Sequence, residues 1–429
     1  MKTAVIGGGI TGLTAALMLT QKGYPVTVFE KDGVLGGLAS SFKSSSWEWP
    51  LERYYHHFFD SDQDLKKLIK DLGIEKKLIF KKPKTSVFVD GKIYRFDNPQ
   101  SVLAFPKLNL TNKFRTGITT LLLKINPFWK PLENITATSF INKTMGKEVY
   151  SIIWKPLLES KFGNYVPQIP ASWFWTRVKK RSFSLGYFQG GTQTLINSLE
   201  DRIKENNGEI LLNKNVEEIK KINNGFELTV NGEKWPESFD QVVATMSPSV
   251  LIQIAPQLSS HKESQFSQLK SLGSLCLVLE LKNTFLSDGT YWLNINDTSF
   301  PFVAVVEHTN YIDKKFYGGN KILFVGGYYP PQHKLFKKDK NKILAEFLPY
   351  LKKINSTFDP KSSLVNCWLF KDYYSQPVIS PNYSKNLPAV KTSIDGLFWG
   401  SLHHVYPQDR GVNYAVALGK KIANEINLR

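Results

Sequence analysis

The sequence predicts an α/β fold of two domains, one built on a parallel sheet and the other, inserted into it, containing helices and a largely antiparallel sheet. Three observations support this prediction. The first thirty residues alternate strand, glycine turn, helix and strand. Several strands between Ser274 and Tyr328 follow one another mostly without intervening helices, which is typical of antiparallel pairing. The length of 429 residues exceeds what one hydrophobic core usually serves.

The opening segment, MKTAVIGGGITGLTAALMLTQKGYPVTVFE, predicts a dinucleotide-binding βαβ unit. Gly7, Gly9 and Gly12 have the GxGxxG spacing that makes a tight turn, lets backbone approach a pyrophosphate and lets the helix pack on the strand. Glu30 follows the second strand, where its carboxylate can accept a ribose 2′-hydroxyl and would repel the 2′-phosphate of NADP. Glycines interrupt the apolar run and no small-residue cleavage site follows, so we expect no secretory signal and a chain that starts in the cytoplasm.

The rest of the chain alternates between the two predicted domains. We expect the parallel-sheet domain to comprise residues 1–55, 184–262 and 375–429, and the inserted domain residues 56–183 and 263–374, with a helical part at about 99–183. The pattern predicts helices over 65–72 and 193–205 and a hairpin over 85–96 that turns at Asp90-Gly91. The predicted strands are 209–219, 225–230, the strand in FDQVVATMSP, 275–281, 291–295, 302–308 and 322–328. A last strand and helix are expected at 397–400 and 411–426.

Composition limits the partners. A hydrophobic content of 42% and a mean hydropathy of −0.24 describe a soluble globular protein, and Cys276 and Cys367 are expected to be core thiols. The net charge of +18 comes mostly from scattered lysines, so solvated lysine faces are favoured and no nucleic-acid partner is expected. Attraction to an anionic membrane surface is the functional alternative. Residues 113–129 combine apolar side chains with lysines; we favour an ordinary buried helix over one on a membrane or lining a channel.

The segments GGGITG, LGGLA, VVATMSP and GLFWGSLHHVYPQDRGVNYAVALG, together with Glu30, resemble the flavin-dependent amine oxidase, protoporphyrinogen oxidase and phytoene desaturase superfamily from end to end. The resemblance implies a Rossmann-like FAD-binding domain of the glutathione-reductase type with an inserted substrate domain. The implied FAD-binding residues are Gly7, Gly9, Gly12, Glu30, Lys31, Gly36, Gly37, Leu38, Val216, Thr245, Gly400, Asp409, Gly411 and Asn413. Leu38 replaces a frequent arginine and the terminal loop is longer and contains histidines, so amine oxidation in particular is put in doubt.

The resemblance also implies that the segment LERYYHHFF and the loop SLHHVYPQDRG border the flavin. The candidate catalytic residues are therefore His56, His403 and Tyr406, although paired histidines are also common as structural residues. The candidate substrate-lining residues are Tyr55, His57, Trp154, Lys161, Trp175 and Arg177, with ordinary packing as the alternative for the tryptophans. The histidine pairs lack further ligands at metal-site spacing, so no metal is expected.

These features predict an FAD-dependent dehydrogenase, desaturase or oxidase that passes hydride from a hydrophobic or amine-bearing substrate to flavin N5. A lipid, isoprenoid or tetrapyrrole substrate is favoured, with oxygen or a quinone as electron acceptor because only one dinucleotide fingerprint is present. The alternative is a non-redox sugar-nucleotide mutase resembling UDP-galactopyranose mutase, which needs paired arginines; Arg177 and Arg181 are the only close pair. The expected location is the cytoplasm, with peripheral contact at the inner face of the membrane as an option. The oligomeric state stays open.

Overall fold

A five-stranded parallel sheet carries the predicted nucleotide-binding unit. The computed structural model describes residues 1–259 and 265–426. The strand order is β10 (Glu209–Leu211), β2 (Val26–Phe29), β1 (Thr3–Ile6), β14 (Gln241–Ala244) and β20 (Leu397–Trp399). The residues of β1, β2, β14 and β20 are all buried, as expected for a parallel sheet covered on both faces. The helices of this part are α1 (Ile10–Gln21), α2 (Gln63–Asp71), α9 (Gln193–Glu205), α10 (Pro248–Ile254) and α15 (Val412–Glu425).

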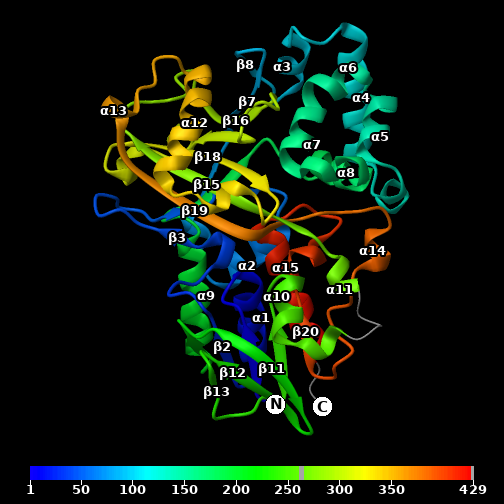
Figure 1. Cartoon of the computed structure of the whole chain (residues 1–429), viewed down its shortest axis with the longest axis vertical. Coiled ribbons are helices and arrows are strands. Elements are labelled where there is room, and N and C mark those ends of the chain that lie inside the picture. Colours follow the sequence, from blue (N-terminus) through cyan, green and yellow to red (C-terminus); the bar gives the residue numbers. More distant parts are fainter. Residues whose placement is uncertain (260–264, 427–429) are drawn as a thin grey trace.

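Helices α1 and α15 pack at the centre of this part, below the larger sheet in Figure 1. Their close approach depends on Gly419, where an added Cβ would lie 2.6 Å from the carbonyl oxygen of Thr11. A small meander of β11 (Val216–Ile222), β12 (Gly225–Val230) and β13 (Glu233–Lys234) packs near β2, since Trp235 meets Phe29 edge-on at 5.1 Å. The prediction of a single strand over 209–219 is wrong, because a turn with Asn213 at positive φ divides this segment into β10 and β11.

The second large sheet has seven strands and confirms the predicted fold class. Its order is β19 (Leu364–Pro377), β15 (Ser271–Leu281), β18 (Lys321–Tyr329), β17 (Ala304–Glu307), β16 (Thr290–Ile295), β7 (Lys84–Val89) and β8 (Lys92–Arg95). Every neighbouring pair is antiparallel except β16 and β7. Helix α12 (Lys340–Ile354) buries Ile343, Phe347 and Leu351 in the core cluster that contains residues of this sheet.

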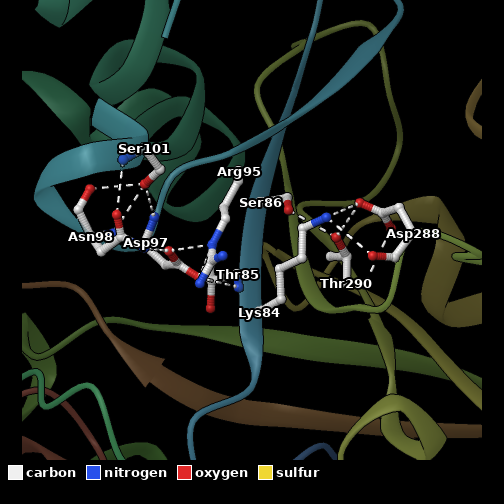
Figure 2. Close-up of polar contacts among 9 residues, drawn as sticks. All are labelled: Lys84, Thr85, Ser86, Arg95, Asp97, Asn98, Ser101, Asp288 and Thr290. Atoms are coloured by element: carbon white, nitrogen blue, oxygen red, sulfur yellow. Dashed lines mark hydrogen bonds and ion pairs between the residues drawn. The ribbon is translucent and has the colours of Figure 1, made fainter. Parts of the chain in front are cut away.

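The β7–β8 hairpin joins this sheet to the helices. Its turn lies at Asp90-Gly91, with both residues at positive φ. Figure 2 shows how the hairpin continues into α3 (Pro99–Ala104): Asp97 accepts hydrogen bonds from Arg95 Nε and Thr85 N, and Asn98 and Ser101 form a capping box. On the other side of β7, Lys84 pairs with Asp288 at 2.6 Å. The contacts of Asp97, Asn98 and Ser101 fix α3, the first helix of the helical part, to the sheet.

The helical part continues through α4 (Leu110–Ile125), α5 (Ala137–Thr144), α6 (Lys147–Val149), α7 (Lys155–Phe162) and α8 (Ala171–Lys179). Short elements complete the described chain: β3 (Ser41–Phe42), β4 (Leu51–Glu52), β5 (Phe58–Phe59), β6 (Leu78–Lys81), β9 (Leu185–Phe188), α11 (Gln265–Gln268), α13 (Pro360–Ser363) and α14 (Tyr383–Asn386). The expectation of an ordinary buried helix over 113–129 is wrong, because the large apolar side chains of α4 are mostly exposed. Among the helices of residues 1–259 and 265–426, none combines the length and hydropathy needed to cross a membrane.

Candidate functional site

The glycine turn after β1 forms the first part of the site. Gly7 has φ +107°, and an added Cβ would lie 2.4 Å from Thr245 Oγ1. A Cβ at Gly12 would lie 2.0 Å from the carbonyl oxygen of Gly7, so α1 can pack there only with glycine. At Gly9, by contrast, a Cβ would meet no described heavy atom within 4 Å. Packing therefore explains Gly7 and Gly12, whereas Gly9 borders open space at the N-terminus of α1, which no side chain caps.

The second glycine loop lies against the first, beside a buried carboxylate. Glu30 is 6% exposed, and its Oε2 accepts a hydrogen bond of 2.7 Å from Gly8 N. Burial raises the pKa of Glu30, although this bond and one from Asp32 N oppose the shift. Gly36 N donates to Gly8 O at 2.8 Å, and Gly37 lies beside Gly9, whose Cα an added Cβ would approach to 3.3 Å. Both loops and the carboxylate thus meet at one end of the parallel sheet.

The other predicted cofactor residues surround this end or support it. Thr245 follows β14 and its hydroxyl donates to Ile6 O at 2.9 Å, while Val216 is buried at the start of β11. Gly400 follows β20, and an added Cβ there would lie 2.4 Å from Ile422 of α15, so packing explains this glycine. Lys31 is exposed and Leu38 is half-buried.

Helix α15 begins at Val412, after Gly411, with no side-chain cap and no acidic residue in its first turn. Its N-terminal partial positive charge is therefore available to an anionic group. Asn413 lies in this turn, but its side-chain oxygen accepts the backbone N–H of Leu65 at 2.9 Å. Asn413 thereby caps α2, so its side-chain oxygen already has a partner within the protein.

Just before α15, a carboxylate gathers cations from distant parts of the chain. Asp409 Oδ2 accepts from Lys161 Nζ at 2.9 Å and from Arg177 Nη1 at 3.3 Å. Burial lowers the pKa of Lys161 to about 7 against the opposing charge of Asp409. Burial alone would raise the pKa of Asp409, but the charges of Lys161 and Arg177 outweigh it and hold this pKa below its usual value. The guanidinium of Arg410 lies 4.5 Å from the ring centroid of Tyr328 and donates to Ser375 O at 3.0 Å.

We call Lys161, Arg177, Asp409 and Arg410 the cation cluster. In it three basic side chains accompany a single carboxylate, and the hydrogen bond of the Arg410 guanidinium goes to the neutral carbonyl of Ser375. A site of this composition can bind an anionic group or hold developing negative charge.

The predicted segment Tyr55–His57 lies near the cation cluster and over the seven-stranded sheet. Tyr55 packs edge-on against Trp292 at 4.7 Å; burial raises its pKa to about 12, and the charge of Arg410 opposes this shift. His56 Nδ1 donates to Tyr54 O at 2.6 Å. Burial lowers the pKa of His56 to about 4, so the ring is neutral near pH 7 and its Nε2 can accept a proton only weakly.

His57 is held in an aromatic setting. Its Nδ1 shares a hydrogen bond of 3.3 Å with Tyr291 OH, and burial lowers its pKa to about 3. We therefore expect His57 to serve as part of this aromatic cluster rather than to transfer protons.

The other two catalytic candidates have partners within the protein. His403 is 2% exposed; Nε2 bonds with Ser271 Oγ at 3.0 Å and Nδ1 with Tyr383 OH, which leaves neither nitrogen available. Tyr406 bonds with Ser172 Oγ at 2.7 Å and packs edge-on against Trp129. His403 and Tyr406 line a small cavity that Asp409 and Arg410 also line.

Two predicted tryptophans serve packing. Trp175 is 3% exposed, and its Nε1 donates to Asn126 O at 2.9 Å, directly after α4. Trp154 packs edge-on against Phe174 at 4.6 Å. Sequence reasoning missed Arg410 and Tyr328. Arg410 could have been found because it adjoins Asp409 in the motif QDRG, whereas nothing in the sequence singles out Tyr328.

The geometry fits a flavin dinucleotide on three observations. An added Cβ at Gly9 meets no described heavy atom within 4 Å at the N-terminus of α1, where a diphosphate would bind. Glu30 is buried beside this turn, and the start of α15 has no side-chain cap and would favour an electron-rich ring. Arg53 adds a buried Nε without a hydrogen-bond partner among the described residues.

Solved structures share this fold over nearly the whole chain. A putative protoporphyrinogen oxidase from Exiguobacterium sp. 255-15 superposes with a TM-score of 0.76 and 17% identity, covering 99% of this chain and 98% of the other. Reduced UDP-galactopyranose mutase superposes with a TM-score of 0.75 and 15% identity, covering 99% of this chain and 95% of the other. Cyclohexylamine oxidase from Brevibacterium oxydans IH-35A superposes with a TM-score of 0.71 and 15% identity, covering 99% of this chain and 98% of the other.

Curated relatives match in part. A 1-hydroxycarotenoid 3,4-desaturase from Flavobacterium sp. (strain P99-3) is 26% identical over 66% of this chain and 64% of its own length. A 15-cis-phytoene desaturase from Synechococcus elongatus is 24% identical over 51% of each. This chain thus spans less than two thirds of the length of either relative. The family model of flavin-containing amine oxidoreductases matches residues 10–427, nearly the entire chain. The chain therefore belongs to the flavin-containing amine oxidoreductase family.

Proposed function

We propose that this protein is an FAD-dependent dehydrogenase, desaturase or oxidase whose substrate is hydrophobic and either neutral or anionic. When bound, FAD supplies the hydride acceptor. Gly9 and the N-terminus of α1 would hold its diphosphate, and Glu30 would accept its ribose hydroxyl in place of the present bond from Gly8. The N-terminus of α15 would stabilise negative charge on the reduced ring.

The observation that carries the substrate class is the charge of the cation cluster beside aromatic walls. An ammonium group within about 4 Å of a guanidinium is opposed by about 4 kcal/mol at an effective dielectric constant of about 20. Asp409 cannot offset this, because it is already paired with Lys161 and Arg177. This composition supports a neutral or anionic substrate over the amine-bearing one. The carotenoids and the protoporphyrinogen in the names of relatives belong to these two classes.

One observation keeps a second function under consideration. A sugar-nucleotide mutase requires cations for a diphosphate, and the sequence offers only Arg177 and Arg181 as a close pair. In the fold, Arg177 pairs with Asp409, and Asp409 directly precedes Arg410 in the chain. Arg177 and Arg410 therefore form a second arginine pair, which supports a diphosphate-bearing substrate better than the sequence alone does. We propose oxygen or a quinone as electron acceptor for the redox function.

The test begins with the cofactor. Flavin released from purified protein is identified by chromatography, and FAD rather than FMN is expected. The holoenzyme is then mixed anaerobically, in separate experiments, with phytoene, protoporphyrinogen and cyclohexylamine. Bleaching of the flavin band by phytoene or protoporphyrinogen supports the proposal, whereas bleaching by the amine alone refutes the substrate class.

The mutase alternative has its own outcome in the same series. Dithionite-reduced protein that isomerises UDP-galactopyranose, together with oxidised protein that no substrate bleaches, would replace the redox proposal by the mutase. Arg410→Met should weaken turnover of an anionic substrate. Trp175→Phe is the matched control in the same region, because Trp175 serves packing and should leave the substrate preference unchanged.

A further inference from the structure

We propose that α4 is a docking surface for an anionic lipid bilayer, with its outer face immersed among the lipids. The helix carries its large apolar side chains outward. Their exposed fractions run from 56% to 67%, and they are Leu110, Phe114, Ile118, Leu121, Leu122 and Ile125. They recur at the spacing of one helical face, as in helices that lie in a membrane interface.

The inner face of α4 is polar and fixed. Its buried residues are Asn112, Thr116, Thr119 and Leu123. Asn112 Nδ2 donates to Glu148 Oε2 at 2.7 Å, and Thr116 Oγ1 donates to Asn112 O at 2.8 Å. Gly146 lies so close that an added Cβ would be 2.4 Å from Asn112 Oδ1. Rotating the helix to bury its apolar face would break the contacts of Asn112 with Glu148 and Gly146, so the outward face follows from the packing of the inner one.

Neighbouring segments enlarge the apolar face. Leu103 is 52% exposed, and its carbonyl accepts a hydrogen bond from Lys113 of α4. Phe128 follows α4 and is 72% exposed, while Phe183 is 66% exposed and follows the segment whose carbonyls Lys124 of α4 contacts. Within the described ranges, every large hydrophobic side chain more than half exposed belongs to these three residues or to the outer face of α4. A patch confined to one place indicates an interaction surface.

The charge around the face indicates its occupant. Residues 98–132 contain no Asp or Glu, and their lysines are Lys107, Lys113, Lys124 and Lys130, of which Lys107 pairs with Asp90 at 2.7 Å. Lys113 and Lys124 donate to neutral carbonyl oxygens, so these bonds leave their charges in place. An apolar strip bordered by lysines complements acyl chains and anionic headgroups better than it complements another copy of the same basic surface.

The face lies close to the proposed active site. Helix α4 packs on α8, which carries Arg177 of the cation cluster, and Trp175 of α8 holds the chain just after α4 through Asn126. Figure 1 shows α4 in the half of the molecule opposite both marked ends of the chain. Docking would therefore place the cation cluster one helix away from the lipids.

The experiment is co-sedimentation of the full chain with vesicles of phosphatidylcholine, with or without phosphatidylserine. The triple variant Ile118→Gln/Leu121→Gln/Leu122→Gln removes three exposed contacts and should keep the fold, which thermal unfolding checks. The matched control is Leu212→Gln/Val365→Gln, two exposed apolar residues elsewhere.

We expect the wild type and the control to bind the phosphatidylserine vesicles, more weakly at high salt, and the triple variant to bind at least tenfold less. No binding by the wild type, or equal binding by the triple variant, overturns the proposal. If the wild type forms a dimer and does not bind vesicles, and the triple variant is monomeric, the face is assigned to self-association instead. Binding is read without any turnover, so its failure is separate from failure of the proposed enzymatic function.

Discussion

Substitution by alanine should affect two glycines of the first turn differently: Gly12→Ala should mainly lower stability, and Gly9→Ala should mainly lower flavin affinity. Gly12→Ala places a Cβ 2.0 Å from the backbone oxygen of Gly7, so α1 must move by more than about 1 Å. Overpacking of this kind costs about 1–3 kcal/mol or more. Gly9→Ala meets no described atom within 4 Å and its φ of −74° suits alanine. Its cost as a poorer helix N-cap is about 1 kcal/mol or less.

Flavin affinity should fall more in Gly9→Ala than in Gly12→Ala, the reverse of the order for stability. A methyl group at Gly9 enters the space proposed for the diphosphate and displaces about one hydrogen bond, worth about 1–3 kcal/mol. Flavin affinity should therefore fall by about 5- to 150-fold. The assays are urea unfolding of the apoprotein and flavin titration followed by fluorescence quenching. Gly117→Ala is the control, because its Cβ also meets no described atom within 4 Å but it lies in α4. Unchanged flavin affinity in Gly9→Ala, or unchanged stability in Gly12→Ala, would refute the reasoning.

The other predictions concern side chains around α15. Asn413→Ala should lower the free energy of unfolding by about 1 kcal/mol through loss of the α2 cap, and flavin content should not change. Tyr383→Phe should cost about 1–3 kcal/mol because it strips one partner from buried His403; a shifted pH–rate profile would instead give His403 a catalytic role. Lys161 has a pKa of about 7, so affinity for an anionic ligand should fall as pH rises through about 7, and Lys161→Met should abolish this inflection. In the unfolded chain Lys161 has its ordinary pKa of 10.5, so between about pH 7 and pH 10.5 the unfolded state binds more protons than the folded state. The free energy of unfolding of the wild type, measured relative to Lys161→Met, should therefore rise with pH in this range.

Turn signals and hydrophobic periodicity predicted those helices and strands whose sequence pattern matches their surroundings in the fold. The βαβ unit and the limits of α9 and β12 follow from strong turn signals and clear periodicity. Helix α12 and strand β19 were not predicted. Pro349 lies inside α12 and suggests a break, although the helix continues through it. Strand β19 lies at the sheet edge and includes Lys371 and Asp372, so its alternation is obscured.

The site could be predicted only as far as its residues are neighbours in the chain. The glycines and Glu30 form a local motif, whereas Lys161, Arg177 and Asp409 meet through tertiary packing of α7, α8 and the loop before α15. Arg410 adjoins Asp409 in sequence, but its ring contact with Tyr328 depends on the end of β18. No spacing rule connects these segments.

Two departures from ordinary protein packing coincide with the features to which function is assigned. A helix ordinarily buries its apolar stripe, yet α4 buries Asn112, Thr116 and Thr119 and exposes leucine, isoleucine and phenylalanine. A cluster that is withdrawn from water ordinarily balances its charges, yet in the partly buried cation cluster Asp409 accompanies three basic side chains. Both arrangements cost stability in water, and both become favourable with a partner: acyl chains for the helix and an anionic group for the cluster. Because α4 packs on α8, which carries Arg177, the exposed apolar face and the cation cluster lie one helix apart.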